Sequence, residues 1–296
     1  MFQGVYTALV TPFNQNGSVD YDCLRALVAR QREAGVSGIV PVGTTGESPS
    51  LSYEEHIKVI ETVVQACGVG TECCKDRPMV IAGTGANSTS EALELTQQAK
   101  AVGADATLQV TPYYNKPSQE GLYRHFMEVA EKGGLPVVLY NVPGRTAKEI
   151  DVQTIARLAS HDMVVAVKEA GGSVDRVSQI RDVCDITVLS GDDILTLPMM
   201  VVGAVGVVSV ASNVIPKPMC ELVAAALEGR WDEARALHTC YYRVMKGFFL
   251  DTNPVPVKTT LAMLGLCEEV FRLPLCPMDP SVRTRLQDVM EKSGVV

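Results

Sequence analysis

Residues 163–170 read Met-Val-Val-Ala-Val-Lys-Glu-Ala, an apolar run that ends in two charged side chains. A run that is apolar on both faces is typical of a strand buried in a parallel sheet. The stretch that follows, residues 175–183, has the apolar spacing of an amphipathic helix. This segment therefore predicts one buried strand and one crossover helix, with Lys168 at the carboxyl end of the strand.

The same order of apolar run, turn and helical stretch occurs eight times along the chain. The predicted strands cover residues 5–11, 38–42, 79–83, 106–111, 136–141, 164–169, 187–190 and 206–211. Helical patterns between them include residues 21–33, 53–66, 90–101, 119–131, 152–158 and 175–183. Eight units without a break in composition favour closure into an α/β fold of the (β/α)8 or TIM-barrel type over an open doubly wound sheet.

We expect the barrel to occupy residues 1–230 and a helical C-terminal extension to occupy residues 231–296. Helices are predicted there at 232–249, 256–264 and 280–291. The uncharged stretch 194–211 is nearly long enough to span a bilayer, but Pro198, Gly203 and Gly206 interrupt it. It therefore predicts a short helix, a turn and a buried strand. Residues 68–78 are expected to form an irregular loop.

The charge balance bears on the partners of the protein. Lys and Arg total 26 against 34 Asp and Glu, a formal charge of -8, which argues against nucleic acid or an anionic membrane as a partner. The nine cysteines form no Cys-x-x-Cys pair and mostly have apolar neighbours, which favours reduced thiols in a cytoplasmic protein. The first 13 residues lack the features of a signal peptide, in agreement with a cytoplasmic location.

In a barrel of this type, the catalytic groups lie at the carboxyl ends of the strands. The residues there are rich in hydroxyl groups and small side chains, include one lysine and lack histidine. The four histidines of the chain lie elsewhere without metal-ligand spacing, so we expect no zinc or iron site. The Gly-x-Ser-x-Gly, P-loop and Rossmann fingerprints are also missing.

Lys168 has two interpretations that the pattern alone does not separate. Burial at the mouth of a barrel favours the neutral amine, which is a nucleophile toward carbonyl groups and can form a Schiff base with a keto substrate. Alternatively, Lys168 forms a salt bridge with a neighbour at the rim of the barrel.

Three hydroxyl side chains could move protons to and from such an imine, namely Tyr140, Thr44 and Tyr114. Each one alone is more often structural, since a tyrosine at a strand end is usually part of the core. The glycines on either side of Thr44-Thr45 predict a tight loop whose backbone amides suit a carboxylate. Arg145 offers a bidentate carboxylate clamp, or else a rim contact without function.

Six motifs of the chain, taken in order, resemble those of the dihydrodipicolinate synthase family, within the N-acetylneuraminate lyase superfamily of pyruvate-dependent aldolases. They are residues 43–48 (GTTGES), 112–121 (PYYNKPSQEG), 140–145 (YNVPGR), 167–170 (VKEA), 190–193 (SGDD) and 253–258 (NPVPVK). The resemblance extends over almost the whole chain, and it strongly favours the Schiff-base interpretation of Lys168.

The resemblance implies a lyase that condenses pyruvate with aspartate 4-semialdehyde, the first committed step toward diaminopimelate and lysine. It implies no metal or organic cofactor and a homotetramer built as a dimer of dimers. By the same resemblance, Lys168 forms the imine, and Tyr140, Thr44 and Tyr114 form the proton relay, with Tyr114 reaching in from a neighbouring subunit. The substrate-binding residues implied are Thr45 for the pyruvate carboxylate, Arg145 for the carboxylate of the aldehyde, the backbone carbonyl of Val208, and Gly191.

Two alternatives remain open at this point. One is another aldolase of the superfamily, such as N-acetylneuraminate lyase, although Arg145 and the Thr44-Thr45 pair favour the synthase. The other is a barrel that has lost catalysis and only binds ligands or partners.

The resemblance also implies a possible second site, at which lysine inhibits some members of the family. Its residues align with His56, Asn87, Glu91 and Tyr113, and all four residue types are present. Tyr53 stands where some inhibited members carry another histidine. The alternative is a set of helix-surface residues that bind nothing.

Overall fold

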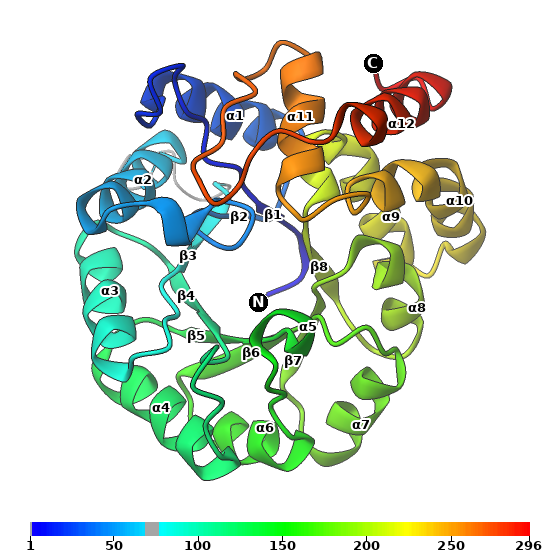
Figure 1. The fold of residues 1–296 in the computed structure, drawn as a ribbon. Helices are drawn as coiled ribbons and strands as arrows, with labels where there is room; N and C mark the ends of the chain where they lie inside the picture. Colours follow the sequence, from blue (N-terminus) through cyan, green and yellow to red (C-terminus); the bar gives the residue numbers. More distant parts are fainter. Residues whose placement is uncertain (1, 69–76) are drawn as a thin grey trace.

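Eight parallel strands form a closed barrel within the residues that the computed structural model describes, 2–68 and 77–296 (Figure 1). The barrel follows chain order, and β1 pairs with β8 to close it. This confirms the predicted (β/α)8 barrel. The strands are β1 (Gly4–Ala8), β2 (Gly38–Val40), β3 (Met79–Gly83), β4 (Ala106–Val110), β5 (Val137–Asn141), β6 (Val164–Glu169), β7 (Thr187–Ser190) and β8 (Gly206–Ser209).

Helices surround the barrel on its outside (Figure 1). Several begin at a side-chain cap, such as Ser52, which forms a capping box with Glu55 at the start of α2. The surrounding helices are α1 (Tyr21–Glu33), α2 (Tyr53–Ala66), α3 (Thr89–Ala101), α4 (Gln119–Lys132), α6 (Val152–Ala159), α7 (Asp175–Val183), α8 (Thr196–Val201) and α9 (Pro216–Leu227). The predicted helical patterns agree with these bounds to within one residue.

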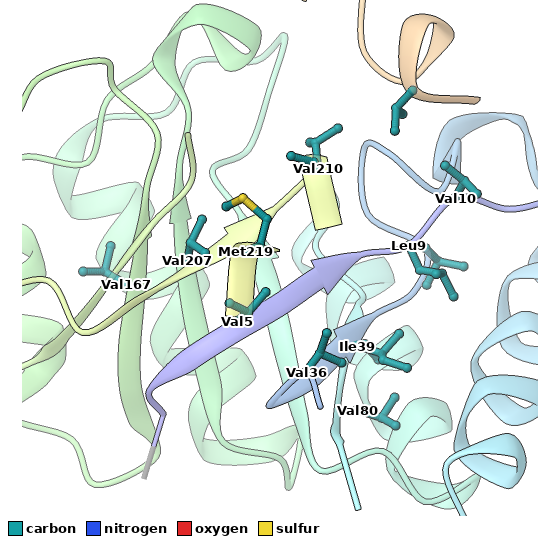
Figure 2. Packing of buried hydrophobic residues seen from close by; sticks show 14 of the residues in the cluster. Val5, Leu9, Val10, Val36, Ile39, Val80, Val167, Val207, Val210 and Met219 are labelled. Atoms are coloured by element: carbon teal, nitrogen blue, oxygen red, sulfur yellow. The ribbon is translucent and has the colours of Figure 1, made fainter. Parts of the chain in front are cut away.

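Buried apolar side chains form two layers on opposite faces of the sheet. One layer lies between strands and helices and includes Val5, Ile39 and Val167 (Figure 2). The other fills the barrel itself and includes Ala166 and Leu189. Because successive side chains of a strand point to opposite faces, Val167 of β6 packs outward and its neighbour Lys168 points into the barrel.

Three further helices follow α9, namely α10 (Trp231–Gly247), α11 (Val255–Met263) and α12 (Pro280–Lys292). α10 packs against α9 and α12, and α11 packs against α12. α11 is buried along most of its length, from Val255 to Leu261. The C-terminal extension is thus helical as expected, and the domain division at residue 230 remains a prediction.

Four predicted strands end earlier than expected. β4 ends at Val110, one residue early, and the other three end where other contacts replace strand pairing. β2 stops at Val40 because Val42 has a left-handed backbone, with φ 50°. β8 stops at Ser209 because the amides of Val210 and Ala211 bond to the Asp193 carboxylate instead of a neighbouring strand. Residues Ala211–Asn213 then form a 3₁₀ helix, η4. β1 ends at Ala8. The amide of Leu9 still donates to the carbonyl oxygen of Val40 in β2, but Phe13 already pairs with Val19 in an isolated antiparallel bridge.

The stretch 194–211 resolves into α8, a turn and β8, as predicted. None of the helices in the described part of the chain is both long and apolar enough to cross a membrane. The short helix α5 (Pro143–Thr146) was not predicted, and it begins with Pro143 at its first position. Of the loop predicted at 68–78, residues 69–76 lie outside the described residues.

Candidate active site

Lys168 is the last residue but one of β6, and its side chain is 6% exposed at the carboxyl end of the barrel. It pairs in register with Tyr140 of β5, and its Nζ lies 3.9 Å from the centroid of the Tyr140 ring. This pairing depends on a register shift, because Val137 pairs with Val164 but Val138 pairs with Ala166. The extra residue in β6 is Val165, a β-bulge that brings Lys168 opposite Tyr140.

The ammonium group of Lys168 has no hydrogen bond or ion pair with any of the residues that the structure describes. The rim salt bridge required by the alternative interpretation is therefore not found within them. Lys168 instead lines a cavity together with Tyr140, and its amine lies against the Tyr140 ring.

Two cavities of about 130 and 190 Å³ lie at this end of the barrel and share Thr44, Tyr140 and Arg145 in their walls. The smaller cavity is the one that Lys168 lines. The larger one extends past Tyr113. The structure thus brings the predicted imine lysine, two predicted relay hydroxyls and the predicted carboxylate clamp to one place. The other predicted residues that line the smaller cavity are Thr45 and Gly191.

The loop after β2 presents Thr44 and Thr45 to the smaller cavity. It is a tight turn in which the Gly46 amide donates to the carbonyl oxygen of residue 43 at 3.1 Å. A side chain at Gly46 would lie 2.9 Å from the Val42 nitrogen, so glycine is required there. The buried Thr45 hydroxyl accepts a hydrogen bond from Asn253 Nδ2 at 3.0 Å.

Left-handed backbone at residues other than glycine concentrates around the mouth of the barrel. In the described chain these residues lie in the loops after β2, β4 and β5, and none is in the loops at the opposite end. Such conformations are costly and are found mostly where function requires them. The residues are Val42, Glu47, Tyr114, Lys116 and Ala147.

Gly191 lies against Lys168, whereas Arg145 lies over the mouth of the barrel. A side chain on Gly191 would lie 3.1 Å from Lys168 Cε and 2.6 Å from the Ala170 side chain, so only glycine leaves room there. Arg145 lies on α5 over the mouth of the barrel and is exposed. Its Nη2 approaches the backbone oxygen of Asn253 at 3.5 Å.

Two predicted site residues lie outside these cavities. Tyr114 is 90% exposed and does not line either cavity of its own chain. Val208 is buried in the interior of the barrel, opposite Tyr6, and is not part of either cavity wall. The roles of both residues remain predictions.

The four residues of the predicted second site lie near the carboxyl ends of β3 and β4. His56 is buried, and its Nε2 lies 2.9 Å from the carbonyl oxygen of Gly83, while burial lowers its pKa. Tyr113 lines the larger cavity, and its pKa is raised by burial and by the charge of Glu91. Asn87 is half-buried, and its backbone carbonyl oxygen accepts a hydrogen bond from Nδ2 of Asn115 at 2.8 Å.

Sequence reasoning missed two residues of the site. Asn253 lines the smaller cavity, but it comes from the C-terminal extension, and a search of strand ends does not reach it. The family motif 253–258, which contains Asn253, was the sequence signal that could have identified this residue. Asp193 is fully buried, and its Oδ2 accepts from the amides of Val210 and Ala211 at 3.0 and 2.9 Å. Asp193 therefore fixes the backbone just after β8, where Val210 joins the cavity wall.

This parallel (β/α)8 barrel has a buried lysine on β6 with a tyrosine against it and no charged partner among the described residues, which is the arrangement of the lysine-dependent, Schiff-base aldolases. A family model described as "Dihydrodipicolinate synthetase family" matches residues 1–293. The chain belongs to this family.

Individual relatives resemble the chain over its whole length. A 4-hydroxy-tetrahydrodipicolinate synthase of Pelobacter propionicus is 51% identical, with 100% of both chains covered. The chloride-inhibited dihydrodipicolinate synthase of Acinetobacter baumannii, solved in complex with pyruvate, is 42% identical with a TM-score of 0.95, and both chains are covered completely. The enzyme of Cyanidioschyzon merolae, solved with lysine bound, is 39% identical with a TM-score of 0.94, covering 100% of this chain and 99% of that one.

Asp193 predicts a pH dependence of stability. Burial raises its pKa from 3.8 to about 6, so the folded protein prefers the neutral carboxyl. This contribution to stability is complete below the unfolded pKa and is lost as the pH rises through about 6. Asp193→Asn cannot ionise and keeps an oxygen for the two amides. The free energy of unfolding of the wild type relative to this variant should therefore fall by about 2 kcal/mol between about pH 4 and pH 7.

Urea unfolding of both proteins across this range measures the difference. Other carboxylates affect both proteins alike and cancel in the comparison. A difference that stays constant with pH would contradict the assignment of Asp193 as a buried, reluctantly ionised acid.

Proposed function

We propose that Lys168 forms an imine with pyruvate and that the chain condenses this imine with aspartate 4-semialdehyde. The product of that reaction is 4-hydroxy-tetrahydrodipicolinate, at the first committed step toward diaminopimelate and lysine. The observation that carries the proposal is the buried Lys168 amine, which has no charged partner among the described residues and lines a cavity beside Tyr140. Membership of the family supports the reaction, and the geometry of Lys168 supports its role as the imine-forming residue.

The chemistry needs a nucleophilic amine and a route for protons. The amine attacks C2 of pyruvate and expels its oxygen as water, which leaves an imine. The imine withdraws electrons, so a methyl proton of C3 can leave and an enamine forms. The enamine carbon then bonds to the aldehyde carbon of the second substrate, which regenerates the imine and leaves a hydroxyl group. The amino group of that substrate attacks the imine carbon and displaces the Lys168 amine, which closes the ring and frees the enzyme. Tyr140, next to the amine, and Thr44, in the same cavity wall, would transfer the protons of these steps.

The surrounding residues suit the two carboxylates. Thr45 and the amides of its tight loop would hold the carboxylate of pyruvate. Arg145, exposed over both cavities, would receive the carboxylate of the aldehyde at the entrance. Gly191 leaves room beside the lysine. The backbone carbonyl of Val208, on β8, would face the site from the interior of the barrel.

Assembly would complete the proton relay. Tyr114 lines neither cavity of its own chain and has 90% of its surface exposed, which fits a side chain that enters the site of a neighbouring subunit. From the resemblance to the family, we propose a homotetramer arranged as a dimer of dimers, and the exposed Tyr114 supports an interface between subunits. All cysteines that the structure describes are free thiols, which supports a reducing, cytoplasmic setting.

Substitution of Lys168 tests the proposal. Lys168→Met should lower turnover of pyruvate with aspartate 4-semialdehyde by roughly a thousandfold or more, because no imine can form. Tyr140→Phe should lower it by about a hundredfold through loss of the phenol proton. Lys217→Met, an exposed lysine of α9, is the matched control and should retain full turnover.

Retained turnover in Lys168→Met would refute the mechanism. Cleavage of sialic acid by the wild type, without activity on aspartate 4-semialdehyde, would instead favour the N-acetylneuraminate lyase alternative. The exposed Arg145 at the cavity entrance favours the synthase, since it is placed to bind a second small carboxylate.

A second proposal is feedback inhibition by lysine at the site of His56, Asn87, Glu91 and Tyr113. The charge of Glu91 acts on Tyr113, so a carboxylate for the ammonium groups of lysine lies close to the larger cavity. The carbonyl oxygen of Gly83 orients the His56 ring through its contact with Nε2. Isothermal titration should detect lysine binding that Glu91→Gln weakens, and a wild type that binds no lysine would remove this proposal.

A further inference from the structure

Lys258 and Glu47 form an ion pair of 2.7 Å in which both side chains are completely buried. They come from distant parts of the chain. Lys258 lies on α11 of the C-terminal extension, and Glu47 ends the loop that carries Thr44 and Thr45 after β2. Neither residue touches the cavities, and the mechanism above does not use either of them.

Aromatic rings and one further cation, Arg272, surround this pair. The ammonium of Lys258 lies 4.0 Å from the centroid of the Phe13 ring and 5.3 Å from that of Phe271. Burial raises the pKa of Glu47 and lowers that of Lys258, and the attraction between the two charges opposes both shifts. Each charge is therefore tolerated at this place because the other is present.

The burial of an ion pair is weak evidence that the pair stabilises the fold. Two apolar side chains of similar volume usually stabilise a fold as well or better, because charges lose their hydration on burial. In some proteins a buried ion pair instead fixes a defined geometry. The relevant question is therefore which part of the molecule the pair holds in place.

Glu47 is held in a demanding backbone conformation, with φ 55° and ψ 34°. Its amide donates to the carbonyl oxygen of Thr44 at 3.1 Å, so residues 44–47 form one closed turn. A shift of Glu47 would consequently move Thr44 and Thr45. The left-handed conformation of a residue other than glycine persists only when its surroundings impose it.

The extension contacts the same loop at two further points. Asn253, just before α11, donates to the Thr45 hydroxyl at 3.0 Å. Arg272 donates to the carbonyl oxygen of Ser50 at 2.9 Å and also lies over the Phe13 ring. The β2 loop is therefore held from outside the barrel on both sides of Glu47.

We propose that Lys258 is a positioning residue for the reaction, which holds Thr44 and Thr45 in place through Glu47. The inference rests on the proposed roles of these two threonines. It makes α11 part of the apparatus of the active site, although α11 lies outside the (β/α)8 unit.

The primary test is Lys258→Met, which removes the charge and keeps an unbranched side chain. Because misplacement of reacting groups by about 1 Å can cost a hundredfold in rate, we expect kcat to fall about tenfold or more and KM for pyruvate to rise. Exchange of the pyruvate methyl protons in D2O, followed by NMR, should slow in parallel. Borohydride at saturating pyruvate should still trap the imine on Lys168, because β6 is not disturbed.

Arg283→Met is the matched control. Arg283 forms an ion pair of 3.0 Å with Glu269 in the same extension, and neither residue contacts the β2 loop. This variant should keep kcat and KM close to the wild-type values. A folded Lys258→Met protein with wild-type kcat, KM and exchange rate would overturn the proposal.

The double variant Glu47→Gln/Lys258→Met covers the case in which the single variant does not fold. Without buried charge, it should recover stability in thermal melting but not kcat. Recovery of both would show that the pair is only structural and would overturn the proposal. The milder Glu47→Asp keeps the charge and retracts it by one methylene, and its kcat should fall several-fold with the Lys168 imine still formed.

Failure of the positioning role and failure of the proposed function give different results. If the wild type forms no imine on Lys168, the proposed function fails. If the wild type forms the imine and the folded variants turn over normally, only the positioning role fails.

Discussion

The pairing of β5 with β6 is the constraint on which the site depends. Side chains of a strand alternate between its two faces, so a slip of one residue would turn Lys168 out of the barrel or pair Tyr140 with Val167. The bulge at Val165 sets the register that is observed, with Ala166 and Lys168 facing inward and Val167 packed outward. The amine and the phenol ring are neighbours because of this single extra residue.

The outer face of the same two strands reinforces that register. Asn141, next to Tyr140, donates from Nδ2 to both carboxylate oxygens of Glu169, each at 3.0 Å. Glu169 is fully buried and adjoins Lys168, and it also receives the Gly171 amide at 2.7 Å. Burial raises the pKa of Glu169, whereas Arg176 and these donors oppose the shift. These polar contacts on the outer face of the sheet thus hold Tyr140 and Lys168 in register on its inner face.

The sequence predicted what periodicity and chain order encode, and it missed what depends on contacts between distant residues. The eight strands, the crossover helices and the place of Lys168 follow from the repeated order of apolar runs and helical spacings, and they are confirmed. The bulge at Val165 has no signal in an apolar run where every residue suits a buried strand. The contact of Asn253 with Thr45 joins residues 208 positions apart, and no local pattern reports such a contact.

The central claim is that the amine of Lys168, and no other, captures the keto substrate. Reduction of the wild-type protein with borohydride in the presence of pyruvate, followed by peptide mapping, tests it most directly. Lys258 is the informative comparison, because it is also a buried lysine but is neutralised by Glu47. The account predicts a stable, pyruvate-dependent adduct on the peptide that contains Lys168. An adduct on Lys258, or on no lysine, would contradict it.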